Sequence, residues 1–373
     1  MTVVLTEDQV EALAGELDAL RRRIVEDLGE SDRRYIYRVI RAQRALEAGG
    51  RILLLFRSRR SRLLGTGALA LSKILDNMEI GHNVMHGQYD WMHDPALNSK
   101  RFEWDTACPA DQWRHSHNFL HHTFTNILDK DRDIGYGVLR MDKQQAWQPR
   151  HLGNPLFALL LMVLFEYGVA VHDLEAGSAV HGTRPLSGDK TLLADIGRKV
   201  GKQVTKDYLL FPALSGRQFI ATAKANAIAN VVRNVWAFSI IFCGHFPAGV
   251  ATFTEDEVQD ETRGRWYIRQ MLGSANVEGG AAFHVLSGNL GHQIEHHIFP
   301  DIPARRYRRI APEVRALCAE YGLPYVTGRY SRQLASTWAK IFRLALPDRR
   351  TTAPQQPAII VVPGAGRLSP AQP

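Results

Sequence analysis

The sequence predicts an all-α fold, namely an integral membrane helical protein with a cytosolic helical cap that holds a histidine-rich metal site. Three observations predict this class. Three apolar stretches are each about long enough to cross a bilayer, eight of the fifteen histidines gather in short boxes at helical spacing, and the N-terminal residues repeat apolar side chains with a helical period. The mean hydropathy of −0.21 indicates that much of the chain lies outside the bilayer.

The N-terminal residues 1–50 are expected to form an amphipathic helical region. Thr6 and Gln9 have the spacing of a helix capping box, in which each side chain binds the backbone N–H of the other residue. Apolar residues then recur at helical intervals, at Val10, Leu13, Leu17, Leu20 and Ile24. This region either lies on the membrane surface or packs against the rest of the protein.

Residues 51–347 are expected to form the membrane domain. Its apolar stretches run over residues 63–80, 154–171 and 221–246, and each is about as long as the ~30 Å hydrocarbon core requires. Glu166 and Arg233 lie within these stretches and would have to face protein or lipid headgroups, because a charge in hydrocarbon is unfavourable. Residues 348–373 are rich in Pro, Gly, Gln and Ala and are expected to form a disordered tail.

Three histidine boxes carry the chemistry. His-x-x-x-His-His occurs at residues 117–122 and 292–297, and His-x-x-x-His occurs at residues 82–86. On an α-helix, residues four apart lie on nearly the same face, about 6 Å apart along the axis. Each box can therefore direct its imidazoles toward one point, where they can bind Fe, Zn, Cu or Ni. One ion takes roughly four to six ligands, so this many histidines indicate two ions side by side.

A further histidine, His245, ends the third apolar stretch and is expected to complete the site. The predicted ligands are therefore His82, His86, His117, His121, His122, His245, His292, His296 and His297. Asp131 and Asp133 follow the second box and are candidates to accept hydrogen bonds from imidazole N–H groups or to act as alternative ligands, with a solvated turn as the other interpretation. The remaining histidines fit no box and are expected not to bind metal: His93, His115, His151, His172, His181 and His284.

Composition narrows the classes of function. The formal charge of +8 and the pI near 9.5 suit nucleic acid, anionic lipid, phosphorylated ligands or an acidic protein. No nucleic-acid recognition motif accompanies the charge, so nucleic acid is not an expected partner. Cys108, Cys243 and Cys318 are scattered without a CxxC pair, which argues against iron–sulfur clusters, zinc ribbons and a disulfide framework. A reducing, cytosol-facing environment is the simpler interpretation.

The boxes and their neighbours resemble the membrane fatty-acid desaturases over about residues 51–347. The matching segments are GHNVMHGQ at 81–88, HNFLHH at 117–122 and QIEHHIFP at 293–300. Within the family, the chain is most similar to the actinobacterial, mycobacterial-type acyl-CoA desaturases such as the stearoyl-CoA 9-desaturases. The resemblance implies a di-iron centre that uses O₂ to introduce a cis double bond at position 9 of stearoyl- or palmitoyl-CoA. It also implies a place in the bacterial inner membrane, with the active site facing the cytosol.

The third box also resembles that of front-end linoleoyl-CoA desaturases, in which glutamine occupies the first ligand position. That match falls on Gln293, beside His292, whereas helix geometry favours His292 because it repeats the second box. A front-end desaturase and a di-iron lipid hydroxylase are therefore alternative functions. A haem-binding electron carrier and a metal-transport or storage protein are alternatives from other classes, although adjacent His-His pairs do not suit haem.

The resemblance implies partners as well. The sequence contains no His-Pro-Gly-Gly haem motif of a fused cytochrome b5 domain and no visible flavin or nicotinamide site. Electrons are therefore expected from a separate donor, either an NADPH-linked oxidoreductase or a ferredoxin, while acyl-CoA and membrane lipids are the other expected partners. Candidate contacts for CoA phosphates, lipid headgroups or the donor follow the third box, with a solvated helix face as the alternative: Arg305, Arg306, Arg308 and Arg309.

Overall fold

The computed structural model describes residues 2–172, 189–348 and 358–362, and these residues are mostly helical, as predicted. The α-helices are α1 (Glu7–Glu26), α2 (Glu30–Leu53), α3 (Arg59–Ile74), α4 (Asn83–Met85), α5 (Ala110–Trp113), α6 (His122–Phe124), α7 (Asn154–Val163), α8 (Phe165–Val171), α10 (Asp189–Val204), α11 (Phe211–Leu214), α12 (Phe219–His245), α13 (Arg263–Leu272), α14 (Ala281–Leu286), α15 (Gln293–Ile298), α16 (Tyr307–Glu320) and α17 (Tyr330–Ala345). Wider π-helical turns adjoin some of them: η1 (Leu75–His82), η4 (Arg114–His121) and η7 (Thr205–Leu210). Short 3-10 helices are η2 (Asp90–Met92), η3 (Pro95–Leu97), η5 (Gly135–Gly137), η6 (Pro149–Gly153), η8 (Gly216–Gln218), η9 (Asp256–Val258), η10 (Leu290–His292) and η11 (Ala304–Arg306).

Strands play a small part in the described residues. β1 (Thr2–Thr6) pairs in parallel with β4 (Ala358–Val362), and β2 (Asn276–Glu278) pairs in parallel with β3 (Thr327–Arg329). The first pairing joins the two ends of the described chain. Within the predicted tail, residues 349–357 and 363–373 lie outside the described residues, as does the predicted non-ligand His181.

The N-terminal helix α1 packs against the rest of the protein. Its predicted capping box is confirmed, because the Gln9 backbone N–H donates to the Thr6 hydroxyl and the Thr6 N–H donates to the Gln9 side chain. The apolar residues predicted to share one face are buried in a core with α13, α15 and α16. Of the two placements expected for this region, packing is the one that α1 adopts.

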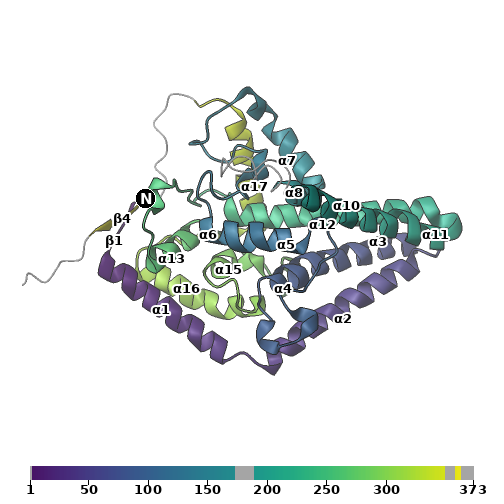
Figure 1. The fold of residues 1–373 in the computed structure, drawn as a ribbon, viewed down its shortest axis with the longest axis horizontal. Coiled ribbons are helices and arrows are strands. Elements are labelled where there is room, and N and C mark those ends of the chain that lie inside the picture. The colour runs from purple at the N-terminus through teal and green to yellow at the C-terminus, as the bar shows by residue number, and fades with distance from the viewer. Residues whose placement is uncertain (1, 173–188, 349–357, 363–373) are drawn as a thin grey trace, which may run out of the picture.

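Helices α2, α3 and α12 lie side by side and form the right half of the molecule in Figure 1, with α11 at its tip. Two glycines let α2 and α3 approach closely, since a Cβ atom on Gly50 would lie only 3.0 Å from the Gly65 carbonyl oxygen. Small residues at such crossings allow helix backbones to pack against each other. The predicted boundary at residue 50 falls inside α2, at this crossing.

One helix of the described residues, Gly216–His245, is long and apolar enough to cross a membrane. A second span exists only if Pro149–Val163 and Phe165–Val171 are counted together, and these two are bent by 100°. The stretch predicted over residues 63–80 is helical but does not meet the same criterion. Glu166 and Arg233 face protein, as expected, because they form a buried ion pair with each other.

Candidate metal centre

The histidine boxes reach one place from separate parts of the chain. The first box lies at the junction of η1 and α4, the second at the junction of η4 and α6, and the third on α15, while His245 is the last residue of α12. The first two boxes therefore lie on π-helical turns, whose i→i+5 hydrogen bonds differ from the α-helical geometry assumed from the sequence. Such turns inside helices are frequent at functional sites.

The imidazoles form two adjacent groups. In the first group, one ring nitrogen from each histidine lies within 4.8 Å of the others, in His82, His86, His117 and His296. In the second group the same holds for His121, His245 and His297. His122 lies between the groups, because its ring centroid is 4.7 Å from that of His86 and 4.6 Å from that of His297. The structure thus brings eight of the nine predicted histidines together.

Asp131 and Asp133 lie where acceptors for imidazole N–H groups were expected. Both carboxylate oxygens of Asp131 are 3.0 Å from Nδ1 of His121, and Asp133 Oδ2 is 3.2 Å from Nδ1 of His117. Burial acts to lower the pKa of His121, but the carboxylates of Asp131 and Asp133 together outweigh it and the pKa is raised. An acceptor on Nδ1 fixes the orientation of an imidazole and leaves Nε2 for a metal.

The third box is held by neutral acceptors instead. Nδ1 of His297 is 2.9 Å from the Gln270 side-chain oxygen, and Nδ1 of His296 is 3.2 Å from the Tyr307 hydroxyl. Burial lowers the pKa of both imidazoles well below their usual range, so they are neutral and keep a lone pair for a ligand bond. The same orientation of Nδ1 toward protein is therefore reached in the second and third boxes with different residues.

Most histidines of the cluster have a buried ring nitrogen without a hydrogen-bond partner. Among the described residues, such Nε2 atoms in the cluster belong to His86, His117, His121, His122 and His296, and outside the cluster Nε2 of His292 also lacks a partner. A buried polar atom without a partner is rare in proteins and unfavourable by about 1–3 kcal/mol. Imidazole nitrogens that converge in two groups are a donor set that iron, zinc and copper take. The residues present therefore fit a metal centre with nitrogen ligands.

His292 is the predicted ligand that the structure does not bring to the cluster. Its ring stacks on His284, with centroids 4.3 Å apart. Its backbone (φ −109°, ψ 58°) is not helical, so the regular helix assumed for the whole box begins only at Gln293. Gln293 points inward instead, with its Nε2 atom 2.9 Å from Nε2 of His245. This break in the helix is the physical reason that helix geometry misplaced His292.

Three residues near the cluster were not identified from the sequence. Gln270 and Tyr307 hold the rings of the third box, and His172, expected only not to bind metal, has Nε2 3.3 Å from Asp133 Oδ1. No motif marks any of them. Only Tyr307 could have been suspected from the sequence. A buried ligand histidine needs an acceptor for its N–H, and polar residues that follow a box closely are candidates for that role.

The four arginines after the third box have different surroundings. Arg306 is buried and its Nε donates to Asp32 at 2.8 Å, and Arg305 lies 3.7 Å from the same carboxylate. Arg306 is therefore engaged within the protein and does not fit the expected contact with CoA or a donor. Two of the four remain exposed, Arg308 and Arg309.

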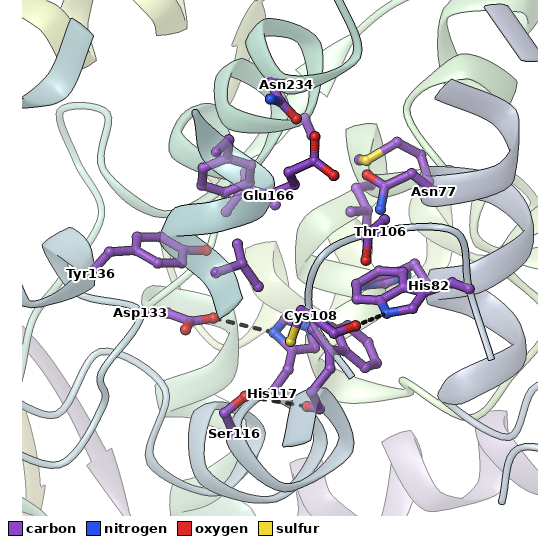
Figure 2. Close-up of a pocket in the computed structure, with 18 of the residues that line it drawn as sticks. Asn77, His82, Thr106, Cys108, Ser116, His117, Asp133, Tyr136, Glu166 and Asn234 are labelled. Carbon is purple, nitrogen blue, oxygen red and sulfur yellow. Dashed lines mark hydrogen bonds and ion pairs between the residues drawn. The ribbon is translucent and has the colours of Figure 1, made fainter. Parts of the chain in front are cut away.

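A cavity with largely apolar walls extends from the histidine cluster between η1, α8 and α12. His82, His117 and His245 line one part of it, and Glu166 and Arg233 line another. Figure 2 shows His117 and Ser116 at one end, with Glu166 and Asn234 at the opposite end. The exposed wall of the cavity is mainly apolar, which suits a hydrocarbon chain, while polar side chains such as Asn77, Thr106 and Asp133 also line it.

Fold and site together define a helical protein in which a buried cluster of histidines lies at one end of an apolar cavity. The sequence model of the fatty acid desaturase family matches residues 63–329. The chain therefore belongs to the fatty acid desaturase family, and the resemblance seen in the histidine boxes is confirmed. Members of this family are oxidoreductases, and so is this protein.

Relatives of known activity cover most of the chain. It is 49% identical over 351 residues to the NADPH-dependent stearoyl-CoA 9-desaturase of Mycobacterium tuberculosis, an alignment that spans 92% of this chain and 82% of the relative. It is 25% identical over 274 residues to the sn-1 linoleoyl-lipid 6-desaturase of Synechocystis, across 71% of this chain and 75% of the relative. An acyl-lipid (7-3)-desaturase of Rebecca salina is 27% identical over 237 residues, across 57% of this chain and 48% of the relative.

Proposed function

We propose that this protein is an O₂-dependent acyl-CoA desaturase that introduces a cis double bond at position 9 of stearoyl-CoA. The observation that carries the proposal is the pair of adjacent histidine groups at the end of an apolar cavity, in a chain of the desaturase family. The relative from Mycobacterium tuberculosis is named for this substrate and this bond position, and its 49% identity over 92% of the chain supports the same reaction here.

The two groups would hold two iron ions. One would be bound by His82, His86, His117 and His296, and the other by His121, His245 and His297, with His122 between them and Gln293 beside His245. When bound, the irons supply the oxidising power, drawn from O₂, that no amino-acid side chain has. Other residues of the site would orient the imidazole rings by contacting their Nδ1 atoms. These residues are Asp131, Asp133, Gln270 and Tyr307.

The reaction removes one hydrogen from each of two neighbouring methylene carbons, and a second bond forms between those carbons. O₂ takes up these two hydrogens together with two electrons and two protons, and the products are the alkene and two water molecules. The protein contributes by holding the acyl chain in one conformation, so that one methylene pair faces the histidine cluster. The electrons would come from a separate NADPH-linked oxidoreductase, which the name of the mycobacterial relative supports over a ferredoxin.

We also infer that the protein lies in the bacterial inner membrane with the histidine cluster on the cytosolic side. The apolar helix Gly216–His245 supports this placement, because it ends in the cluster. Exposed large apolar side chains gather where α2 ends, where α3 and α12 begin and on α11, at the right-hand tip in Figure 1: Ile52, Leu55, Phe56, Leu63, Leu64, Leu214 and Ile220. Lipid would cover these side chains.

One observation favours a second candidate, a front-end desaturase that acts nearer the carboxyl end of the chain. Gln293, rather than His292, is the residue of the third box that points to His245. This agrees with the front-end pattern seen in the sequence, and the sn-1 linoleoyl-lipid 6-desaturase is among the relatives. The two candidates differ in the position of the new double bond.

Fatty-acid profiling of a host that expresses the chain with its electron donor tests both candidates. Mass spectrometry should find products two hydrogens lighter than the saturated acids, with the double bond at position 9. A bond at position 6 would favour the front-end alternative, and a gain of oxygen would favour a hydroxylase. Absence of any new product from iron-supplemented cells that contain the protein and its donor would contradict the proposal.

A further inference from the structure

One face of α12 forms a wall of the cavity. Arg233, Asn234, Ala237, Ile241 and His245 all line it, and their spacing places them on one stripe of the helix. His245 belongs to the histidine cluster, and Arg233 is twelve residues earlier, about 18 Å away along the axis at ~1.5 Å per residue. The stripe therefore runs from the histidine cluster to a charged side chain, with apolar side chains between them.

The guanidinium of Arg233 forms a buried ion pair with Glu166 of α8. Only 2% of the Arg233 side chain and 3% of the Glu166 side chain are exposed. Gln203 of α10 donates to the second carboxylate oxygen of Glu166 at 2.7 Å, and Nε of Arg233 donates to Asn234 at 3.2 Å. The pair thus joins α8, α10 and α12 across the end of the cavity that Figure 2 shows farthest from His117.

A charged pair is an unusual end for a cavity that otherwise suits hydrocarbon. Buried ion pairs are often no more stabilising than apolar residues of the same size, and charged residues in apolar spans are functional candidates. The methyl end of a hydrocarbon chain gains no attraction from the pair. It also cannot push the two side chains apart without leaving a buried charge unpaired. The pair therefore differs from an apolar wall, which can repack around a longer chain.

We propose that the Glu166–Arg233 ion pair closes the methyl end of the acyl cavity and sets the longest acyl chain that this protein desaturates. The inference rests on the proposed function, because it takes an acyl chain as the occupant of the cavity. The substrates are then saturated acyl-CoA molecules whose chain beyond the reacting carbons fits between the histidine cluster and the pair. Ala237 and Ile241, which lie between the two ends on the same stripe, contact that part of the chain.

The first test changes both partners together, in the double variant Glu166→Ala with Arg233→Ala. Removing the two charges at once leaves no lone buried charge and lengthens the cavity. The full-length protein and its electron donor are given arachidoyl-CoA and stearoyl-CoA, and the products are compared by mass spectrometry. The ratio of arachidoyl to stearoyl conversion should rise at least about tenfold, because one methylene that does not fit changes a rate by roughly 10–200-fold.

The second test shortens the cavity and leaves the pair intact. In Ala237→Leu, a larger side chain projects from the middle of the stripe, so the ratio of palmitoyl-CoA to stearoyl-CoA conversion should rise about tenfold. Ala227→Leu is the matched control, since Ala227 lies on the same helix but does not line the cavity. It should leave the chain-length ratios within about twofold of the wild type.

Shifts in the stated directions support the proposal. Unchanged ratios in either variant, with the wild type active on stearoyl-CoA, overturn it, and Ala237→Leu decides if the double variant does not accumulate. Loss of activity on every chain length in Ala237→Leu, with Ala227→Leu active, also counts against it, because a length stop leaves shorter chains as substrates. If the wild type forms no double bond in any acyl-CoA, the proposed function fails, and this inference fails with it.

Discussion

In the histidines of the cluster, Nδ1 and Nε2 of the same ring have different neighbours. Nδ1 of His121 meets a carboxylate, and Nδ1 of His297 meets an amide oxygen. Nε2 of His121 is buried without a partner among the described residues. Because the acceptor on one nitrogen decides which way the other points, residues that never touch a metal help to decide how tightly it is bound. Substituting one of these acceptors therefore tests the site while every proposed ligand stays in place.

We expect Asp131→Asn to lower metal affinity or activity by about 10–100-fold, because it weakens the acceptor on His121 while keeping the shape of the side chain. Asp129→Asn is the matched control on the same turn, where Asp129 is exposed. It should change activity by less than about twofold. Iron content and oxygen-dependent turnover of purified variants provide the measurement. Equal effects of the two substitutions would remove the role assigned to Asp131.

Two histidines of the third box, His292 and His296, should respond differently to substitution. His296→Gln should reduce activity by more than about 100-fold, because His296 belongs to the first histidine group and losing a ligand exceeds the effect of losing a ring acceptor. His292→Gln should keep activity within about threefold, since its ring stacks on His284 outside the groups. Turnover assays at equal protein levels compare the two. An inactive His292→Gln variant that is folded would restore His292 as a ligand.

Sequence spacing predicts the site well where the chain is continuously helical and fails where it is not. The His82 and His86 pair and the second box converge even though their turns are π-helical, because four or five residues still return to one side of the axis. The third box breaks at His292, the last residue of the short 3-10 helix η10, because its backbone angles are not helical. Nothing in the spacing of the histidines reveals that break.

Contacts between distant elements lie beyond what the pattern can predict. Gln270 reaches His297 from α13, and Arg306 reaches Asp32 across 274 residues of sequence. Neither residue type nor spacing indicates these partners, because the contacts depend on how α13 packs on α15 and how η11 packs on α2. Arg306 was expected from the sequence to contact CoA, lipid headgroups or the electron donor. It instead connects the start of α16 to the start of α2.

The Arg306–Asp32 ion pair should have a measurable effect on the stability of the protein. Arg306→Ala should lower the free energy of unfolding by up to about 3–5 kcal/mol, because it removes the cation that hydrogen-bonds the fully buried Asp32 and leaves only Arg305, 3.7 Å away. Arg308→Ala, at an exposed position two residues later in α16, should change the free energy of unfolding by less than about 0.5 kcal/mol. Thermal or urea unfolding in detergent compares the two. A small effect of Arg306→Ala would show that Asp32 finds water or another cation.

At the scale of the whole molecule, the main functional features lie along helix α12. The histidine cluster lies at one end of α12, and the exposed apolar side chains of α2, α3 and α11 lie around the other end. The cavity runs alongside α12, between the Glu166–Arg233 ion pair and the histidine cluster. The helical content is confirmed, whereas membrane insertion follows from the apolar helix Gly216–His245 and the exposed patch, and stays a prediction.

Membrane insertion has a direct check. Because the patch and α12 need hydrocarbon around them, the protein should stay in the membrane pellet after washing with alkaline carbonate, and detergent should release it. As a control, Asp129→Asn, far from the patch in sequence, should behave like the wild type. Release by carbonate alone would indicate a protein that only lies on the bilayer surface.

The central claim is that two histidine groups hold two iron ions. Iron bound per active chain tests it most directly, in the wild type and in variants that each remove one ligand, His86→Ala in the first group and His121→Ala in the second. We predict about two irons per wild-type chain, with at least about one iron and nearly all desaturation lost in each variant. Full iron content and activity in both variants, or an active wild type that holds no iron, would contradict the account.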